Sequence, residues 1–469
     1  MFTASASLLS LSLTAPSLGQ VPAKWTREVV VRSQVPASGT SQPPGFPSTF
    51  DFNREAPVFD TDGAFVIVGA FNNASGNPLA YDILRAVPGG VATLIHPMSA
   101  SAGPADAIDA RDGLVAIVAT VPPPVGGSPR RVIRLLDASG LVVADIENGG
   151  PLGVSGGFAS ARLGVAGMQV AYRAITSTTA YIIEDLGLPS RQQSLVVQVG
   201  GQFASLGQAA ISRDFRFAAR STEAVPPPGA PIPVLNAWTP SGANTQVLAR
   251  SAPGEELNEV SEYKGGALLH VYRANSTAPR ELRLTTSGAG AVIASNASGV
   301  GRNGFENAAV LNGFGMARLF DDAGVAFVGR RVGLDAVYVS TTAHPPLRVV
   351  GDGDTLLTAD GPRTLGFTGT FGRQSIGRID SRGRLDRPCS CEIVFSAILN
   401  DASDVLVHAK PCLADYNLDG LVDPDDLADY VSDFFASAPP LRADVNCDNA
   451  IDPDDLADFI AKYFAAGCA

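Results

Sequence analysis

The chain has 469 residues, of which 17% are charged and 45% belong to the hydrophobic set, so it is a folded protein long enough for more than one domain. The formal net charge of −12 argues against nucleic acid as a partner. The 49 glycines and 34 prolines follow no collagen-like period, and with many short runs of Val, Ile, Leu and Phe they favour a mainly β fold.

The N-terminus is typical of an exported protein. Leu8–Leu13 forms a short apolar core, and Ser17–Gly19 offers small residues for cleavage. We expect a signal peptide over residues 1–19 and an N-terminal segment over residues 20–44, in a secreted or cell-surface associated protein. A cytosolic start is the alternative, since no Lys or Arg precedes Lys24. No later stretch approaches the ~20 apolar residues that span a bilayer, so no membrane span is expected.

Residues 45–410 repeat a motif in which a turn rich in Asp, Gly and Arg leads into an alternating apolar strand. The turn residues fall at positions 63, 113, 164, 214, 265, 324 and 383, with spacings of 50, 51, 50, 51, 59 and 59 residues. Most turns are followed by a second hairpin, so each repeat offers three or four antiparallel strands. One such sheet cannot bury both faces alone, so this period predicts a β-propeller-like repeat domain of six or seven blades. The alternative is a sandwich of loosely similar hairpins.

These turns resemble those of bacterial secreted tandem-repeat proteins with Asn-x-x-Gly-x-x-Ala-Phe repeats. The resemblance covers most of residues 50–400, although only Gly324–Phe327 keeps the Gly-Val-Ala-Phe core, without the Asn. It implies a propeller-like body with a separate anchoring module at the C-terminus, and no known activity.

The repeat domain shows no catalytic or cofactor-binding motif, so we assign it neither kind of residue. Its four histidines are isolated from one another and from cysteines and paired carboxylates; they are His96, His270, His344 and His408. The turns at 60–63 and 321–322 are acidic enough to bind a cation. However, Asp before Gly is also the usual hairpin pair, and we favour the turn interpretation.

The acidity of the chain belongs to its C-terminal module, residues 411–469. From residue 412 onward there are thirteen Asp, one Arg and one Lys, a net charge of −11, which leaves −1 for the rest of the chain. Such a concentration of carboxylates is typical of a site for hard cations.

Two twelve-residue loops in this module, 415–426 and 444–455, predict two calcium sites. Oxygen-bearing side chains stand at positions 1, 3, 5, 9 and 12 of each loop, and position 7 would offer its backbone carbonyl. The predicted ligands are Asp415, Asn417, Asp419, Leu421, Asp423 and Asp426 in the first loop, and Asp444, Asn446, Asp448, Ala450, Asp452 and Asp455 in the second. Position 6 is Gly420 in the first loop but Asn449 in the second, so we expect the second Ca²⁺ site to be weaker.

Each loop leads into a predicted helix, and the block Asp-Pro-Asp-Asp-Leu-Ala-Asp occurs at both 423–429 and 452–458. Tandem EF-hand-type loops with Asp at position 12 and no full entering helix resemble the type I dockerin. One dockerin variety has a Cys before the first loop and ends in Gly-Cys, and Cys412 and Cys468 occupy those places, so the resemblance implies a disulfide between them. Cys447 is expected to be free. Cys389 and Cys391 remain open between an internal pair, an oxidation site and two thiols.

Dockerins bind a cohesin through their duplicated helices, so the resemblance implies a cohesin-like or other surface receptor protein as partner. The recognition residues would be Pro424, Asp425, Pro453 and Asp454. We therefore expect a secreted non-catalytic repeat protein that is attached to a complex or cell surface through a calcium-dependent module. The alternative is an extracellular polysaccharide-active hydrolase or lyase whose propeller is the catalytic domain.

Overall fold

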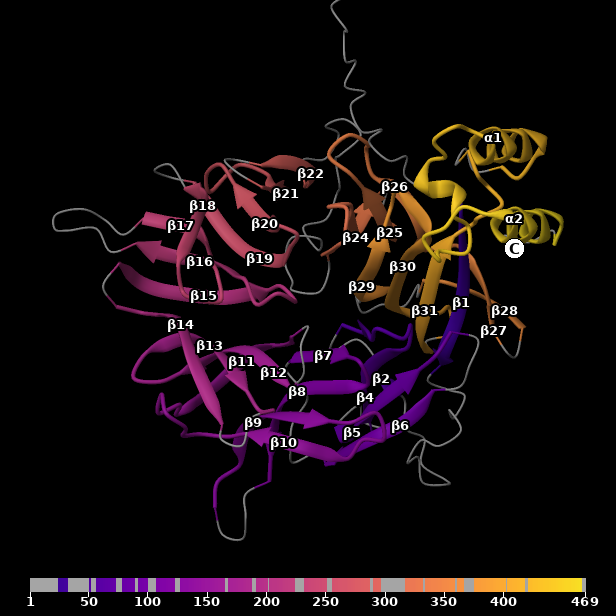
Figure 1. Ribbon diagram of the computed structural model, residues 1–469. Coiled ribbons are helices and arrows are strands. Elements are labelled where there is room, and N and C mark those ends of the chain that lie inside the picture. The colour runs from indigo at the N-terminus through magenta and orange to yellow at the C-terminus, as the bar shows by residue number, and fades with distance from the viewer. Residues whose placement is uncertain are drawn as a thin grey trace, which may run out of the picture.

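The structure is a computed structural model, shown in Figure 1. It describes residues 24–32, 50–51, 56–72, 78–88, 92–99, 107–122, 127–164, 168–187, 191–200, 202–223, 232–250, 255–286, 290–296, 317–331, 334–358, 361–366, 375–401, 403–417 and 421–465. Within these ranges no helix is long and apolar enough to cross a membrane.

The chain forms a seven-bladed β-propeller followed by two short helices (Figure 1). Blade 1 contains β2 (Phe50–Asp51), β3 (Val58–Phe59), β4 (Phe65–Asn72), β5 (Pro78–Ala86) and β6 (Thr93–Ser99). Blade 2 contains β7 (Ala107–Arg111), β8 (Leu114–Val121), β9 (Arg130–Leu136) and β10 (Val142–Ile146). Blade 3 contains β11 (Gly156–Leu163), β12 (Gln169–Ile175), β13 (Thr179–Asp185) and β14 (Gln192–Gln198). Blade 4 contains β15 (Phe203–Ile211), β16 (Phe217–Glu223), β17 (Ile232–Trp238) and β18 (Asn244–Arg250). Blade 5 contains β19 (Glu256–Lys264), β20 (Ala267–Arg273), β21 (Arg280–Thr285) and β22 (Ala291–Ser295). Blade 6 contains β23 (Ala317–Leu319), β24 (Val325–Arg331), β25 (Leu334–Ser340) and β26 (Leu347–Gly351), and a hairpin of β27 (Thr355–Thr358) and β28 (Gly361–Thr364) follows it.

Blade 7 closes the ring with strands from both ends of the chain. It contains β29 (Ile376–Arg384), β30 (Arg387–Ile398) and β31 (Asp404–Pro411), and its outer strand is β1 (Trp25–Arg32), which pairs antiparallel with β31. The inner strands β3, β7, β11, β15, β19, β23 and β29 each contact the next one around the axis. The prediction of a propeller is therefore confirmed with seven blades, and the sandwich alternative is excluded. Residues 25–32, predicted as a segment before the propeller, belong to its last blade.

The second strand of each blade is buried because neighbouring blades cover both of its faces. In β8, Val115 and Ile117 belong to a core cluster shared with Val66 of blade 1. The alternate residues Ala116 and Val118 belong to a cluster shared with blade 3. Since successive side chains of a strand point to opposite faces, an uninterrupted apolar run serves both interfaces.

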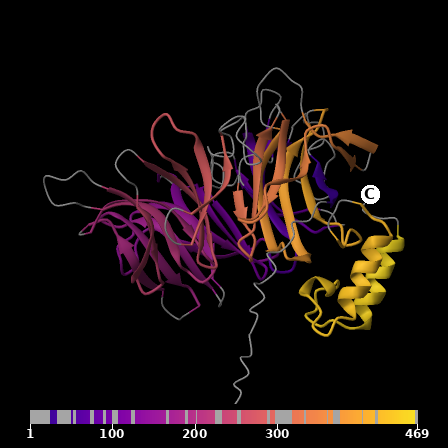
Figure 2. The same ribbon diagram turned by 90° about the horizontal axis from the view of Figure 1, so that it is seen from above.

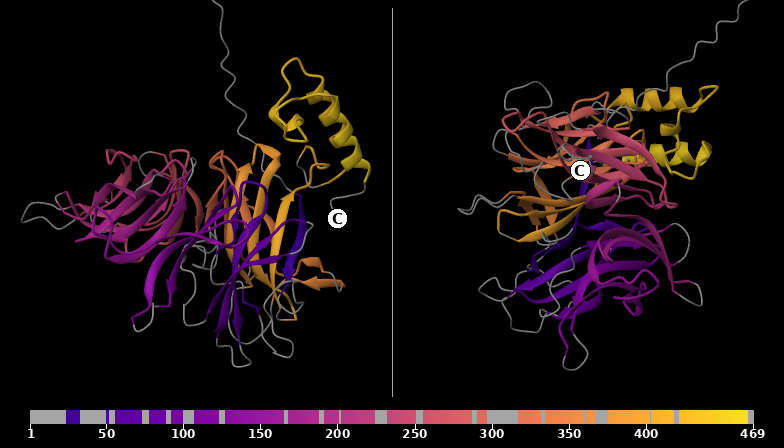
Figure 3. Two further views of the ribbon diagram at one scale, coloured as in Figure 1. Left: turned by 60° about the horizontal axis from the view of Figure 1, so that its bottom comes forward. Right: turned by 90° about the vertical axis from the view of Figure 1, so that its left-hand side faces the viewer.

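The C-terminal helices are α1 (Pro424–Phe434) and α2 (Pro453–Phe464), with a 3₁₀ turn, η3 (Leu441–Ala443), between them. In Figures 2 and 3 both helices lie outside the propeller, beside the strands of blade 7. Each helix begins with an Asp capping box and a proline in its first turn. The rings of Tyr430 and Phe459 stack at 4.0 Å between the two helices.

The cysteines pair differently from the sequence-based prediction. Cys389 on β30 forms a disulfide with Cys447, which we expected to be free, and Cys391 is the buried free thiol of the described residues. The sequence could not show this bond because its partners lie 58 residues apart, in two separate parts of the fold. Cys412 is also disulfide-bonded, and its expected partner Cys468 lies outside the described residues.

Candidate functional site

The second loop, residues 444–455, folds around the carboxylates at its first and last predicted ligand positions. Asp455 is fully buried, and its carboxylate accepts hydrogen bonds from the N–H groups of Val445 (2.7 Å), Asn446 (3.1 Å) and Asp452 (3.0 Å). Asp444, which is 1% exposed, accepts hydrogen bonds from the N–H groups of residues 448 and 449 at 3.2 and 3.0 Å. The backbone thus fixes both buried carboxylates at the two ends of the loop.

The tight turn of this loop depends on two residues in the left-handed region. Asn449, at position 6, has φ 73°, and Cys447, at position 4, has φ 66°. Asn tolerates this conformation better than other residues that carry a Cβ. Asn449 therefore takes the conformation for which Gly was expected.

The first loop, residues 415–426, repeats this arrangement where it is described. Asp426 is fully buried and accepts hydrogen bonds from the N–H groups of Asn417 (3.0 Å) and Asp423 (2.9 Å), and Asp415 is 1% exposed. Residues 418–420, which include the predicted ligand Asp419 and the turn residue Gly420, lie outside the described residues. Asp426 and Asp415 are thus as deeply buried as their counterparts Asp455 and Asp444.

The donor set of the loops fits a hard divalent cation, because carboxylate, amide and backbone oxygens are the ligands that Ca²⁺ prefers. Asp455 and Asp426 are buried carboxylates whose described partners are backbone N–H groups, so a cation would offset their desolvation. Among the described residues, no three His, Cys, Asp or Glu side chains are gathered as a metal cluster. In the second loop, the side chains of Asn446 and Asp448 instead accept hydrogen bonds from loop N–H groups at 2.9 and 2.8 Å.

The predicted recognition residues lie at equivalent exposed places. Pro424 and Asp425 begin α1, Pro453 and Asp454 begin α2, and all four are exposed. Two apolar residues further along the helices, Val431 on α1 and Ile460 on α2, are 37% and 39% exposed.

Two aromatic residues at the C-terminal ends of the helices are exposed, which the sequence analysis did not predict. Phe435 and Phe464 follow Val431 and Ile460 by one helical turn and are 72% and 71% exposed. Each residue of one pair lies 29 residues from its counterpart, which is also the spacing of the loops. That duplication was the signal that could have revealed them. The module therefore presents the same apolar pair twice.

Blade 7 of the propeller contacts the second loop through its strand β30. The Arg387 guanidinium forms an ion pair with Asp444 and donates a hydrogen bond from Nη1 to Asn449 Oδ1 at 2.8 Å. Two residues further along β30, Cys389 is bonded to Cys447. The second loop is thus held by a charge contact and a covalent bond from outside the module.

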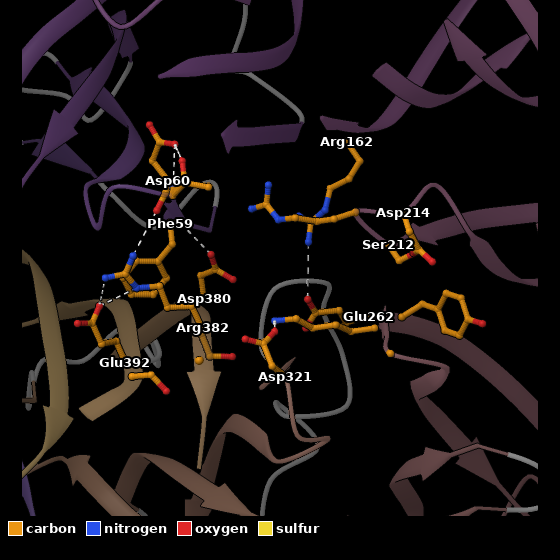
Figure 4. Close-up of a pocket in the computed structure, with 18 of the residues that line it drawn as sticks. Phe59, Asp60, Arg162, Ser212, Asp214, Glu262, Asp321, Asp380, Arg382 and Glu392 are labelled. Carbon is orange, nitrogen blue, oxygen red and sulfur yellow. Dashed lines mark hydrogen bonds and ion pairs between the residues drawn. The ribbon is translucent and has the colours of Figure 1, made fainter. Parts of the chain in front are cut away.

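A second candidate site is a cavity of about 710 Å³ whose lining comes from the inner strands and turns of the propeller (Figure 4). Acidic and basic side chains line it, including Arg162, Glu262, Asp321, Asp380, Arg382 and Glu392. A polysaccharide-active enzyme would need a pair of free carboxylates here, and a non-catalytic axis could present a smooth wall of small residues. The cavity shows neither.

Three acids around the axis connect neighbouring blades. Asp109 accepts a hydrogen bond from Leu163 N–H of the next blade at 2.7 Å, and Asp380 accepts one from Phe59 N–H at 2.9 Å. Glu262 makes the same contact with Leu319 N–H. These acids occupy equivalent places on β7, β19 and β29, so they join blades 2 to 3, 5 to 6 and 7 to 1.

Arginines at the equivalent places on other inner strands balance these acids. Arg162 lies 3.2 Å from Asp109 and 3.8 Å from Glu262, and Arg318 lies 3.5 Å from Asp380. The sequence analysis missed this ring because its members are single residues about one repeat apart. Alignment of the repeats on their turn residues was the signal that could have found it.

A further ion pair on the cavity wall joins Arg382 and Glu392, with His408 behind it. Arg382 Nε donates a hydrogen bond to Glu392 Oε2 at 2.8 Å, and His408 Nε2 lies 3.5 Å from the same oxygen. Burial raises the pKa of Glu392, but His408 and Arg382 outweigh burial and hold that pKa below its usual value. Glu392 is therefore an ionised partner of Arg382 and is poorly suited to act as a general acid.

The acidic turns at 60–63 and 321–322 have the geometry of hairpin turns. Asp62 Oδ1 accepts a hydrogen bond from Ala64 N–H at 3.1 Å, and Gly63 takes φ 88°. Asp322 Oδ1 accepts a hydrogen bond from Gly324 N–H at 3.1 Å. The local bonds support the turn interpretation over a cation site.

Comparison with known proteins finds no matching family model and no matching curated protein. Several solved structures share the fold at low similarity. One, from a study of two prolyl endopeptidases, is 14% identical with a TM-score of 0.42 over 78% of this chain and 50% of that chain. A chain of the mitotic checkpoint complex is 8% identical, with a TM-score of 0.38, over 86% of this chain and 98% of that chain. The Myceliophteria thermophila Cps50 (Swd1) β-propeller domain is 11% identical, with a TM-score of 0.37, over 78% of this chain and 98% of that chain. The chain thus spans about half the length of the prolyl endopeptidase, and none of these similarities bears on its activity.

Proposed function

We propose that this protein is a secreted, non-catalytic propeller that is attached to a complex or cell surface through a calcium-dependent, dockerin-type C-terminal module. The observation that carries the proposal is the duplication of the loop and its helix. Both loops have oxygen donors at the same five positions, and in both the residues at loop positions 9 and 12 cap the helix that follows. A chance acidic segment would not repeat the ligand pattern together with the cap. Two Ca²⁺ ions, one in each loop, would be held by the residues named above.

An exposed pair of apolar residues occurs once with each helix, and this repetition supports a protein partner. Val431 with Phe435, and Ile460 with Phe464, present similar surfaces toward the C-terminal ends of α1 and α2. Large aromatic side chains that remain exposed are typical of docking surfaces. We infer that a cohesin-like receptor contacts this surface.

The charge pairing of the axial cavity favours a non-catalytic propeller over a polysaccharide-active enzyme. A glycosidase uses one carboxyl group as an acid and a second as a base or nucleophile. Asp109, Glu262 and Asp380 are instead bound to backbone N–H groups of the next blade and lie near arginines. Releasing any of them for catalysis would break a blade junction.

Affinity capture from the source secretome tests the proposal. The full-length chain, with its two helices intact, is expected to retain a receptor in calcium and to release it in chelator. The double variant Phe435→Ser/Phe464→Ser is expected to lose capture. A matched control is Leu357→Ser, which removes a side chain that is 75% exposed on the β27–β28 hairpin. Capture that survives both chelation and the double substitution would refute the proposal.

A further inference from the structure

Strand β30 of the propeller holds the second loop at three of its twelve positions. Arg387 pairs with Asp444 at position 1 and donates to Asn449 Oδ1 at position 6, and Cys389 is bonded to Cys447 at position 4. Arg387 is only 14% exposed and Asp444 only 1%. The Arg387–Asp444 pair therefore lies in a water-poor contact, where a charge acts strongly on its neighbours, whereas Asn449 is exposed.

The guanidinium shares one carboxylate oxygen of Asp444 with the loop itself. Asp444 Oδ2 accepts hydrogen bonds from Asn449 N–H and pairs with Arg387 Nη2, while Oδ1 accepts a hydrogen bond from Asp448 N–H at 3.2 Å. Each loop carries five Asp residues. In the second loop, Arg387 of the propeller places a positive charge beside them.

We propose that β30 sets the calcium affinity of the second loop in two opposite directions: the Cys389–Cys447 bond keeps the loop in its binding shape, and the Arg387 guanidinium weakens the binding of the cation. The proposal rests on the proposed function, since it presumes that the loops bind calcium. It makes the propeller a regulator of one site of the module.

The two signs follow from what each contact does before and after the cation binds. Arg387 stabilises the unliganded loop by offsetting repulsion among its carboxylates, and it repels a cation that arrives there. The disulfide restricts the unliganded loop to conformations near the bound one, so less conformational entropy is lost on binding. Removal of Arg387 is therefore expected to strengthen binding, and removal of the bond to weaken it.

The test measures calcium binding to the full-length chain, because a fragment starting at residue 411 would lack both contacts. Arg387→Met keeps the aliphatic stem without the charge and is expected to raise the affinity of the second loop by about fivefold to tenfold. The double variant Cys389→Ser/Cys447→Ser is expected to lower it by roughly threefold to tenfold. The control is Arg384→Met, which removes a neighbouring charge that pairs with Asp386 at 2.6 Å.

Two readouts assign the effect to one loop. Calorimetry in an Asp426→Ala background reports the second loop with the first disabled. Hydrogen exchange of peptides covering 415–426 and 444–455, followed through a calcium titration of chains with an intact first loop, gives the same assignment if that background fails to fold. In chelator, residues 444–455 are expected to exchange faster once the disulfide is removed.

The outcomes separate this inference from the proposed function. Calcium binding to neither loop of the wild-type chain would overturn both. Binding to both loops, with the second-loop affinity unchanged or lowered by Arg387→Met, would overturn the role of Arg387 alone. Equal affinity with and without the disulfide would overturn the role of the bond, and a change confined to the first loop would overturn the whole inference.

Discussion

The propeller and the C-terminal module are stabilised in different ways. Outside residues 412–469 the chain has a net charge of only −1, and acids near the propeller axis lie opposite arginines, as in Arg162 and Asp109. The module has a net charge of −11 and a small core around Tyr430 and Phe459. One of its two basic side chains, Arg442, pairs with Asp433.

The two regions differ in whether their own side chains balance their charge. Around the propeller axis, acids and arginines lie close together and offset each other's charge. In the module the carboxylates outnumber the basic groups, and repulsion among them opposes folding until a cation or a neighbouring charge offsets it. Arg387 of the propeller is such a neighbour for the second loop.

Removal of calcium should destabilise the C-terminal module and leave the stability of the propeller unchanged. If the loops bind Ca²⁺ at about a thousandfold excess over the dissociation constant, each site adds roughly 4 kcal/mol to the stability of the module. In chelator we expect α1 and α2 to lose protection in hydrogen-exchange measurements, while the second strands of the blades keep theirs. Equal protection of α1 and α2 with and without chelator would show that the module does not depend on metal.

Substitution of Asp380 should affect the propeller alone. The variant Asp380→Ala removes the acceptor of the Phe59 N–H bond and the partner of Arg318 at the junction between blades 7 and 1. Breaking a largely buried charge pair costs about 3 to 5 kcal/mol. Chemical denaturation would measure this loss, with Asp386→Ala, which breaks the more exposed pair with Arg384, as a control expected to cost less than about 1 kcal/mol. A similar loss in both variants would argue against a special role for the axial ring.

The propeller could be predicted from the sequence because its repeats are local patterns, whereas the contacts that join distant segments could not. Six of the seven predicted turn residues, at 63, 113, 164, 214, 265 and 324, lie between the inner strand and the next strand of their blade, as the period implied. The seventh, at 383, lies inside β29, and the turn of blade 7 is formed by residues 385–386. By contrast, β1 pairs with a strand at the other end of the chain, and no pattern in residues 25–32 indicates that partner.

Calcium ligands could be assigned residue by residue because all of them lie within twelve positions of one loop, and this assignment stays a prediction. The influence of blade 7 on the second loop could not be predicted, since Arg387 is one arginine among many in the sequence. Its role arises only when β30 places it beside Asp444. The ligand pattern within each loop could thus be identified from the sequence, and the contact between the second loop and the propeller could not.

Mild acid should weaken the propeller through His270. This residue is buried on β20, and burial, with the nearby Arg283 charge, lowers its pKa to about 4 from an ordinary value of 6.5. The unfolded chain therefore binds the proton first, so stability is complete above pH 6.5 and is lost as the pH falls toward 4, by about 3 kcal/mol in total.

The variant His270→Gln keeps a polar group beside Thr285 but cannot take up that proton. Between pH 7.5 and pH 4.5 its unfolding free energy should fall by roughly 2 to 3 kcal/mol less than that of the wild-type chain. Measurements of both chains over that range would check the difference. Parallel pH profiles would place the acid sensitivity elsewhere in the molecule.

The smallest expected effect concerns the turn residue that distinguishes the second loop from the first. Asn449 has φ 73°, which Ala adopts at a cost of about 1 kcal/mol and Gly adopts freely. Asn449→Ala and Asn449→Gly both remove the hydrogen bond that Arg387 donates to the side chain at 2.8 Å, so that loss cancels when the two variants are compared. Asn449→Ala should therefore bind calcium at the second loop about fivefold more weakly than Asn449→Gly, because the strain must be overcome to form the binding turn. Calorimetry of the two full-length variants would measure that ratio, and equal affinities would mean that the clamp from β30, not the residue at position 6, determines the conformation of the turn.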